Sequence, residues 1–331
     1  LTHECHTVTA ILFTQAAMSA SNVSVDVATF FPDIKGNLTK IVWEHAVNSK
    51  EKLDNALVSA NVMMLEADVT LGTLNATNGN STLIPIMAHP PESKSNLSLD
   101  DFLNTVIKRN VSKGIKLDFK SIDAFNASIS ILEKVRNNTK FPVFLNADIL
   151  PGPVNANTTP VTAKDFVTQA KAFPEYTLSV GWTTRYGTKD NVTEGRYTEQ
   201  QIQDMVNILK EQKVTQPITY PVRAGLAANS MKVIKSLMEN SSFTSNVTLT
   251  VWSSEGDKVD AETLSTLIRD IGVKKVYVDV PQDLMNKLYL SGASSVMVAS
   301  VTLAVSLLTG LLSTILWLFL FVILARFCRF L

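Results

Sequence analysis

Eight apolar runs, each followed by an amphipathic stretch, alternate between residues 38 and 290. The runs are short and rich in β-branched residues, as buried strands are: KIVWEHA, VMMLEADV, GIKLDFK, FPVFLNADI, TLSVGWTT, PITYPVRA, VTLTVWSS and KVYVDVP. Ser98, Ser121 and Thr198 stand where three of the helices would be capped. Eight strand–helix units in about 250 residues predict an α/β fold, a (β/α)8 TIM barrel. A further short strand is expected in the insert from Thr82 to Ser93.

The second predicted strand ends in two acids, Glu66 and Asp68, on one face, because side chains alternate along a strand. Two carboxylates buried side by side repel each other unless something compensates them. Asp118 lies near the end of the next barrel strand, and such strand ends meet at one mouth of the barrel. We therefore expect Glu66, Asp68 and Asp118 to converge on one Mg²⁺ or Ca²⁺ ion, since both ions prefer oxygen ligands.

Histidine is scarce in the predicted barrel. Of the four histidines, His3 and His6 precede it, and only His45 and His89 lie within it, each at the end of an apolar run. One such histidine is most simply a satisfied core residue, but two beside paired acids favour an acid–base pair acting on a phosphodiester. The sequence does not decide which of the two is the base. A neighbouring cation is expected to lower the pKa of histidine and favour the neutral form.

Two lysines, Lys116 and Lys120, share a strand face with Asp118. Either can act as a catalytic group by neutralising charge on phosphorus oxygens, or can form a structural ion pair with the acids. Asp148 is expected either to reach the metal or to cap a loop. Six further residues near strand ends are candidates for substrate binding: Asn48, Asn146, Trp182, Arg185, Arg223 and Trp252.

Four motifs in order, WEHAVNS, LEADV, IMAHPP and GIKLDFK, resemble the signature of the menorin family over residues 38–290. The menorin domain in turn resembles the phospholipase-C-like phosphodiesterase barrels, which include glycerophosphodiester phosphodiesterases and sphingomyelinases D. The resemblance implies that His45 and His89 are catalytic, that Glu66, Asp68 and Asp118 bind the metal, and that Lys120 assists. Two departures argue against the usual glycerophosphodiester substrate: the first motif reads His-Ala-Val-Asn in place of His-Arg-Gly, and a proline follows His89 in place of an acid.

Two functions of different classes follow from the resemblance. The first is a metal-dependent phosphodiesterase acting on a lipid or a small phosphodiester. The second is a catalytically inert, membrane-anchored ligand or co-receptor, because menorin-family members are implicated in cell-surface complexes that guide neuronal branching. Every core position of the motif set is filled, which favours retained metal binding and, more weakly, catalysis.

An uncharged run of 30 residues, Val296 to Ala325, follows the predicted barrel. About 20 apolar residues span a bilayer, so we expect a transmembrane helix over residues 296–325. Arg326 and Arg329 then indicate a short cytoplasmic tail, residues 326–331, and a single-pass type I topology. A GPI anchor is the alternative, because residues 291–295 are small. Residues 1–21 resemble the remnant of a signal peptide.

Twelve Asn-x-Ser/Thr sequons indicate the secretory pathway, and place the barrel in the lumen or outside the cell at the plasma membrane. They lie at Asn22, Asn37, Asn75, Asn80, Asn96, Asn110, Asn126, Asn137, Asn157, Asn191, Asn240 and Asn246. The formal net charge is zero, so no nucleic-acid partner is expected. The expected partners are the membrane and extracellular proteins. The two cysteines, Cys5 and Cys328, exclude a disulfide within the barrel.

Overall fold

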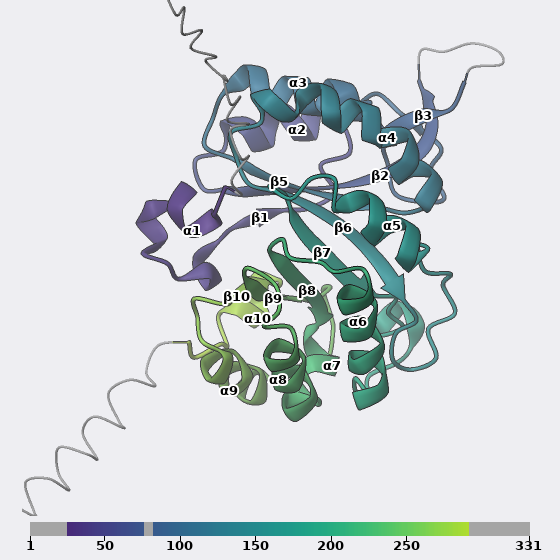
Figure 1. Ribbon diagram of the computed structural model, residues 1–331. Coiled ribbons are helices and arrows are strands. Elements are labelled where there is room, and N and C mark those ends of the chain that lie inside the picture. The colour runs from purple at the N-terminus through teal and green to yellow at the C-terminus, as the bar shows by residue number, and fades with distance from the viewer. Residues whose placement is uncertain (1–24, 76–81, 291–331) are drawn as a thin grey trace, which may run out of the picture.

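Parallel strands surrounded by helices form the body of the molecule in the computed structural model, which describes residues 25–75 and 82–290 (Figure 1). The strands follow the order β1-β2-β5-β6-β7-β8-β9-β10, which makes a nearly closed barrel and confirms the α/β, TIM-like architecture. The barrel strands are β1 Trp43–Glu44, β2 Met64–Leu74, β5 Gly114–Phe119, β6 Val143–Leu150, β7 Thr177–Trp182, β8 Ile218–Arg223, β9 Val247–Trp252 and β10 Val276–Asp279.

Helices follow the strands as the sequence predicts, with two differences. They are α2 Lys50–Val58, α3 Leu99–Arg109, α4 Ile122–Val135, α5 Ala163–Ala170, α6 Glu199–Glu211, α7 Ala224–Ala228, α8 Met231–Asn240, α9 Ala261–Ile271 and α10 Gln282–Met285. The short α7 was not predicted and precedes α8 directly; all five of its residues are buried. The last helix is four residues long, shorter than the predicted stretch from 281 to 289.

The faces of a barrel strand differ in chemistry. In β2, Leu65, Ala67 and Val69 join the apolar core that also contains helix residues such as Leu53 and Phe102. Glu66 and Asp68 alternate with them and therefore face the barrel interior. The apolar core thus lies between strands and helices, while the interior near the mouth is polar.

The seam between β1 and β10 is closed by side chains. These two strands stand at the ends of the strand order and are not paired with each other. The rings of Trp43 and Tyr277 meet edge to face with centroids 6.0 Å apart, and His45 contacts Asp279 beyond them. β1 is shorter than the predicted run because Ala46, at φ 49°, turns the chain out of the strand.

The folded unit begins earlier than the predicted boundary at residue 38. Three short turns, α1 Val27–Phe30, η1 Pro32–Ile34 and η2 Leu38–Lys40, pack their apolar side chains against Met64, Phe144 and Tyr277. Met64 and Phe144 stand near the starts of β2 and β6, so this segment covers the amino-terminal end of the barrel. Turns of three or four residues have no periodicity that a sequence reading can detect.

The insert after β2 forms the expected strand, β3 Ile84–Met87, together with β4 Lys94–Ser95. β3 runs antiparallel to β2, with Met87 opposite Val69, while β4 pairs with β2 in parallel. Gly72 allows this close approach, because a Cβ there would lie 2.4 Å from both the Ser93 carbonyl and the Ile86 side chain. The insert therefore brings the chain back to the mouth of the barrel.

Two predicted segments lie outside the described residues: the signal-peptide remnant, residues 1–21, and the transmembrane helix with its tail, residues 296–331. Among the helices within 25–75 and 82–290, none combines the length and the apolar character needed to cross a bilayer.

Candidate functional site

Three carboxylates meet at the mouth of the barrel, as the sequence predicts. Asp68 and Asp118 are neighbours in the register of β2 and β5, and Glu66 lies two residues before Asp68 on the same face. One ligand oxygen from each of the three lies within 4.8 Å of the others. All three donors are oxygens, which suits a hard cation such as Mg²⁺ or Ca²⁺. The chemistry and the spacing of the three acids therefore fit a divalent cation.

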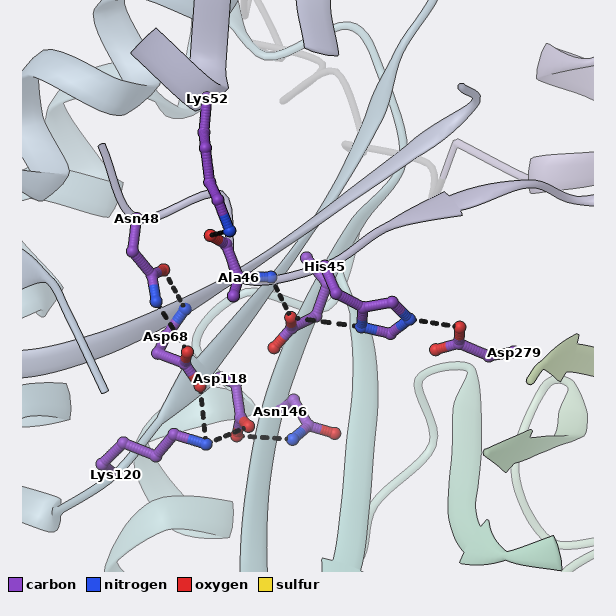
Figure 2. A network of polar contacts seen from close by, with 10 residues as sticks. His45, Ala46, Asn48, Lys52, Asp68, Asp118, Lys120, Asn146 and Asp279 are labelled. Carbon is purple, nitrogen blue, oxygen red and sulfur yellow. Dashed lines mark hydrogen bonds and ion pairs between the residues drawn. The ribbon is translucent and has the colours of Figure 1, made fainter. Parts of the chain in front are cut away.

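Lys120 neutralises two of these acids. Its ammonium lies 2.7 Å from Asp68 and 2.5 Å from Asp118 (Figure 2). Burial acts to lower the pKa of Lys120, but Asp118 and Asp68 together raise it well above its usual value. Lys120 therefore stays charged and compensates two of the clustered carboxylates within the protein itself.

His45 is held between two carboxylates. Its Nε2 lies 2.5 Å from Asp279 Oδ1, and its Nδ1 lies 3.5 Å from Glu66 Oε2. Burial acts to lower the pKa of His45, but the hydrogen bonds to Asp279 and Glu66 outweigh it and raise the pKa to about 10. The two flanking carboxylates thus favour the protonated ring, whereas a neighbouring cation would favour the neutral form.

The pKa of Glu66 is lowered, as expected for the negative partner of a protonated His45. Its burial acts to raise its pKa, but the hydrogen bond with His45 and the charge of Lys116 lower that pKa to about 2. Glu66 Oε2 also accepts a hydrogen bond of 3.0 Å from the backbone N–H of Ala46. The carboxylate is thus ionised and fixed in position.

The chain after β1 is fastened to the acid cluster at several points. Asn48 donates to Asp68 Oδ2 at 2.8 Å and accepts from the Asp68 backbone N–H at 3.0 Å. Lys52 donates to the carbonyl of Ala46 at 3.2 Å. These contacts hold the left-handed turn at Ala46 and the orientation of the neighbouring His45.

Asn146 supports the cluster from β6. Its amide nitrogen donates to Asp118 Oδ1 at 2.6 Å, and its amide oxygen accepts from Ser179 at 2.6 Å. The residue is 4% exposed, so the structure places it in the barrel interior as a positioning group for Asp118.

His89 returns to the mouth through the antiparallel insert. The neighbouring Ala88 donates its backbone N–H to the Asp68 carbonyl at 3.1 Å, which fixes His89 beside the acid cluster. The His89 ring is exposed, and its Nδ1 lies 2.7 Å from the carbonyl of Pro90. A carbonyl oxygen only accepts, so Nδ1 carries the proton and Nε2 has the free lone pair when the ring is neutral.

Lys116 lies deeper in the barrel. It is 7% exposed, and its ammonium lies 5.9 Å from the centre of the Trp43 ring. It is not among the residues that line the mouth cavity. It is the register partner of Glu66 on the neighbouring strand, a position that suits charge compensation in the barrel interior.

A cavity of about 490 Å³ opens beside the cluster. Six predicted residues line this cavity: His89, Asp118, Lys120, Asp148, Arg223 and Trp252. Burial and the charge of Asp118 raise the pKa of Asp148 to about 7, despite the opposing lysines.

His45 and Asp279 line a second cavity, of about 580 Å³, along the seam between β1 and β10. Trp252, Ser254 and Glu255 line both cavities, so the two adjoin at this wall.

Two of the predicted substrate-binding residues lie elsewhere. Trp182 points away from the mouth: it is 2% exposed, and its ring packs against Tyr197 at 5.4 Å and Tyr220 at 6.2 Å. Arg185 is exposed and does not line the mouth cavity. Trp182 falls on the outer face because inward and outward side chains alternate, and its neighbour Gly181 takes the inward position opposite Asp148.

The structure describes ten of the sequon asparagines, and eight of these are exposed: Asn75, Asn110, Asn126, Asn137, Asn157, Asn191, Asn240 and Asn246. Asn37 and Asn96 are half-buried. Asn22 and Asn80 lie outside the described residues.

Comparison with known proteins places the sequence in a family. The Menorin N-terminal domain family matches residues 37–285, which is most of the chain and all of the site described above. The chain belongs to the menorin family. Human Protein FAM151B is 39% identical to it over 242 residues, which cover 73% of this chain and 82% of that protein.

One residue of this menorin-family site escaped the sequence reading. Asp279, the partner of His45, is 5% exposed and ends β10 at an inward position two residues after Tyr277. A lone acid in the apolar run KVYVDVP was the available signal, since a buried charge in a strand needs a partner. The partner lies at the other end of the barrel domain, and only closure of the sheet brings the two together.

Proposed function

We propose that this menorin-family protein is a divalent-cation-dependent phosphodiesterase whose site is the carboxyl-terminal mouth of its barrel. One observation carries the proposal: ligand oxygens of Glu66, Asp68 and Asp118 lie within 4.8 Å of one another beside a cavity of about 490 Å³. Mg²⁺ or Ca²⁺ held by these acids would supply charge stabilisation for a phosphodiester oxygen. The resemblance to the phospholipase-C-like barrels supports the same assignment.

The two histidines suit opposite roles in proton transfer. Nε2 of His89 is free to accept a proton, because Nδ1 is hydrogen-bonded to the Pro90 carbonyl. Both ring nitrogens of His45 face carboxylates, which favour the protonated ring and so suit the role of proton donor. We therefore assign His89 as the base and His45 as the acid of the first step.

Lys120 would stabilise negative charge at the same place. Its side chain is 22% exposed, and it lines the mouth cavity next to Asp118. A cationic donor in a partly buried site stabilises charge that develops on phosphorus oxygens.

A second candidate function is a catalytically inert ligand or co-receptor with the same barrel. One observation favours it: Lys120 and His45 form ion pairs with the three acids, so side chains of the protein can compensate the cluster. A site satisfied in this way can persist as a purely structural network.

Cation binding and turnover separate the two functions. Calorimetry with Mg²⁺ and Ca²⁺ on the purified protein should show one site that Asp118→Asn abolishes, while Asp165→Asn, a change of an exposed acid on α5, should leave it intact. A panel of lipid and small phosphodiesters should then reveal a substrate, and His45→Ala or His89→Ala should slow its turnover by about 10²–10⁴-fold. Cation binding without turnover of any substrate would favour the inert ligand.

The location is a further part of the proposal: a glycosylated barrel outside the cell or in the lumen, with residues 296–325 in the membrane. The exposure of eight sequon asparagines is compatible with glycans at those sites. A chain that ends at Ser291 should be secreted, and enzymatic deglycosylation should increase its gel mobility. Release of the full-length protein from cells by a phosphatidylinositol-specific phospholipase would instead show a GPI anchor and rule out the transmembrane helix.

A further inference from the structure

The wall of the mouth cavity is rich in hydroxyl groups. Six threonine and serine side chains line it: Thr158, Thr159, Thr183, Thr184, Thr188 and Ser254. Among the described residues, the Thr183 hydroxyl accepts a hydrogen bond from the Gly152 backbone, and the hydroxyls of the other five make none to the protein. Each free hydroxyl can both donate and accept, so this wall offers paired donors and acceptors to a ligand.

An arginine held in one orientation stands in the same wall. Arg223 donates from Nε and Nη2 to the two oxygens of Asp257, at 2.6 and 2.9 Å, and its guanidinium lies 4.3 Å from the centre of the Trp252 ring. Within the described part of the chain, Nη1 donates to no protein atom. Because Nε, Nη2 and one face of the guanidinium are occupied, the two N–H groups of Nη1 remain for a ligand in the cavity.

The charges around the cavity limit what that ligand can be. The lining holds three cationic side chains, Lys120, Lys189 and Arg223, and five acids: Asp118, Asp148, Asp190, Glu255 and Asp257. A divalent cation would offset this excess only in part, because Glu66 and Asp68 of the same cation cluster add two further carboxylates, and one phosphodiester adds a single negative charge. Further phosphates or carboxylates on the ligand would meet uncompensated acids, so a highly anionic ligand is disfavoured.

A quaternary ammonium headgroup is also a poor fit. Such groups bind on the faces of aromatic rings, and the guanidinium of Arg223 already covers one face of Trp252. The other two aromatic rings in the lining, Phe119 and Tyr186, are 1% and 3% exposed, and the Tyr186 hydroxyl donates to the Lys258 carbonyl at 2.6 Å. No open aromatic cage faces the cavity among the described residues.

We propose that the mouth cavity binds an uncharged, polyhydroxylated headgroup, such as a sugar or cyclic polyol, esterified to the phosphate of the substrate. The hydroxyls of Thr184 and Thr188 and the free Nη1 of Arg223 recognise this headgroup. The inference rests on the proposed function for the position of the phosphate, and it names the substrate class for that site.

Equilibrium binding tests the inference without requiring turnover. The full-length protein in detergent, with Ca²⁺ present, is titrated calorimetrically with glycerophosphoinositol, glycerophosphocholine and bis(4-nitrophenyl) phosphate. Glycerophosphoinositol should bind most tightly of the three. The double variant Thr184→Val/Thr188→Val removes two hydroxyls at nearly constant volume. It should weaken the binding of glycerophosphoinositol by roughly tenfold, because each neutral hydrogen bond contributes a few-fold in affinity.

Two controls keep the result specific. The serine pair Thr184→Ser/Thr188→Ser retains both hydroxyls and should bind as the wild type does, and Thr105→Val, on the outer helix α3, should change nothing. Equal affinity for the three probes, or full binding by the valine pair, would overturn the inference. Tighter binding of glycerophosphocholine would instead assign the cavity to a quaternary ammonium headgroup.

The outcomes separate this inference from the proposed function. If glycerophosphoinositol binds through the threonines but no phosphodiester turns over, the catalytic proposal fails and the polyol site stands. If phosphodiesters turn over but the valine pair cleaves glycerophosphoinositol with unchanged KM, the catalytic proposal stands and the polyol site fails.

Discussion

His45 and Asp279 meet across the one unpaired seam of the barrel, with Nε2 and Oδ1 2.5 Å apart. His45 follows the first strand and Asp279 ends the last, so their contact joins two ends of the sheet that share no backbone pairing. The ring also reaches Glu66, one of the three clustered acids. Closure of the barrel and orientation of the site are therefore coupled through one histidine.

The first prediction concerns the pH dependence of this contact. The folded pKa of His45, about 10, lies above its ordinary value of 6.5, so its stabilisation is fully present below pH 6.5 and is lost as the pH rises through 10. Asp279→Asn removes the negative partner and should destabilise the protein most near pH 6.5. The difference in free energy of unfolding between variant and wild type should shrink toward pH 10. Urea denaturation with a chelator present measures it, and Asp283→Asn, an exposed acid on α10, is the control. A difference that does not vary with pH would contradict the assignment.

Lys120 is predicted to compete with a cation for Asp68 and Asp118. Lys120→Met should lower the free energy of unfolding by up to about 3–5 kcal/mol without metal, because it leaves the acids uncompensated. Since Lys120 is 22% exposed, the loss should fall in the lower part of that range. Ca²⁺ or Mg²⁺ should restore stability and raise the Tm of this variant more than that of the wild type.

Lys134→Met is the matched control for this experiment, because Lys134 pairs with Asp100 on the protein surface. This variant should lower the free energy of unfolding by less than about 1 kcal/mol, and Ca²⁺ or Mg²⁺ should not change that loss. If the Tm of Lys120→Met is indifferent to Ca²⁺ and Mg²⁺, the acids do not form a cation site.

Asp148 should show the same direction of pH dependence as His45 but at lower pH, because its folded pKa is also raised. Its folded pKa of about 7 lies above its ordinary value of 3.8, so its ionisation destabilises the fold as the pH rises from about 4 through 7. Asp148→Asn removes this ionisation, so its stability relative to the wild type should improve over that range. Thermal denaturation in a chelator between pH 4.5 and 7.5 measures the trend, with Asp165→Asn as the control. A stability difference between variant and wild type that does not change with pH would mean that the Asp148 carboxyl is solvated in the folded protein.

Replacing only Arg223 of the Arg223–Asp257 pair should destabilise the fold more than replacing both residues. Their side chains are 9% and 1% exposed, so Arg223→Met leaves a buried negative charge and should cost about 3–5 kcal/mol. The double variant Arg223→Met/Asp257→Asn should recover part of this loss, which a double-mutant cycle by urea denaturation measures. Lys258→Met breaks an exposed pair with Glu194 and should cost less than about 1 kcal/mol. Additive losses in the cycle would mean that the two side chains are not coupled.

The barrel itself was predictable because its signal is local. Strand and helix periods differ, and eight alternations of the two leave few other folds for this length. The acids were predictable for the same reason: Glu66 and Asp68 share a face by the period of two, and Asp118 lies near the end of the adjacent strand. The alternation and the motif order LEADV and GIKLDFK thus determined both the fold class and the place of the acid cluster.

What the sequence could not decide depends on contacts between distant residues. The partner of His45 lies 234 residues away, and the choice of Lys120, rather than Lys116, as the bridge between Asp68 and Asp118 depends on depth within the barrel. The same holds for Trp182, which lies at a strand end but on the outer face. Alternation along a strand assigns relative faces, but only sheet register and closure decide which face is inside and which charges meet there.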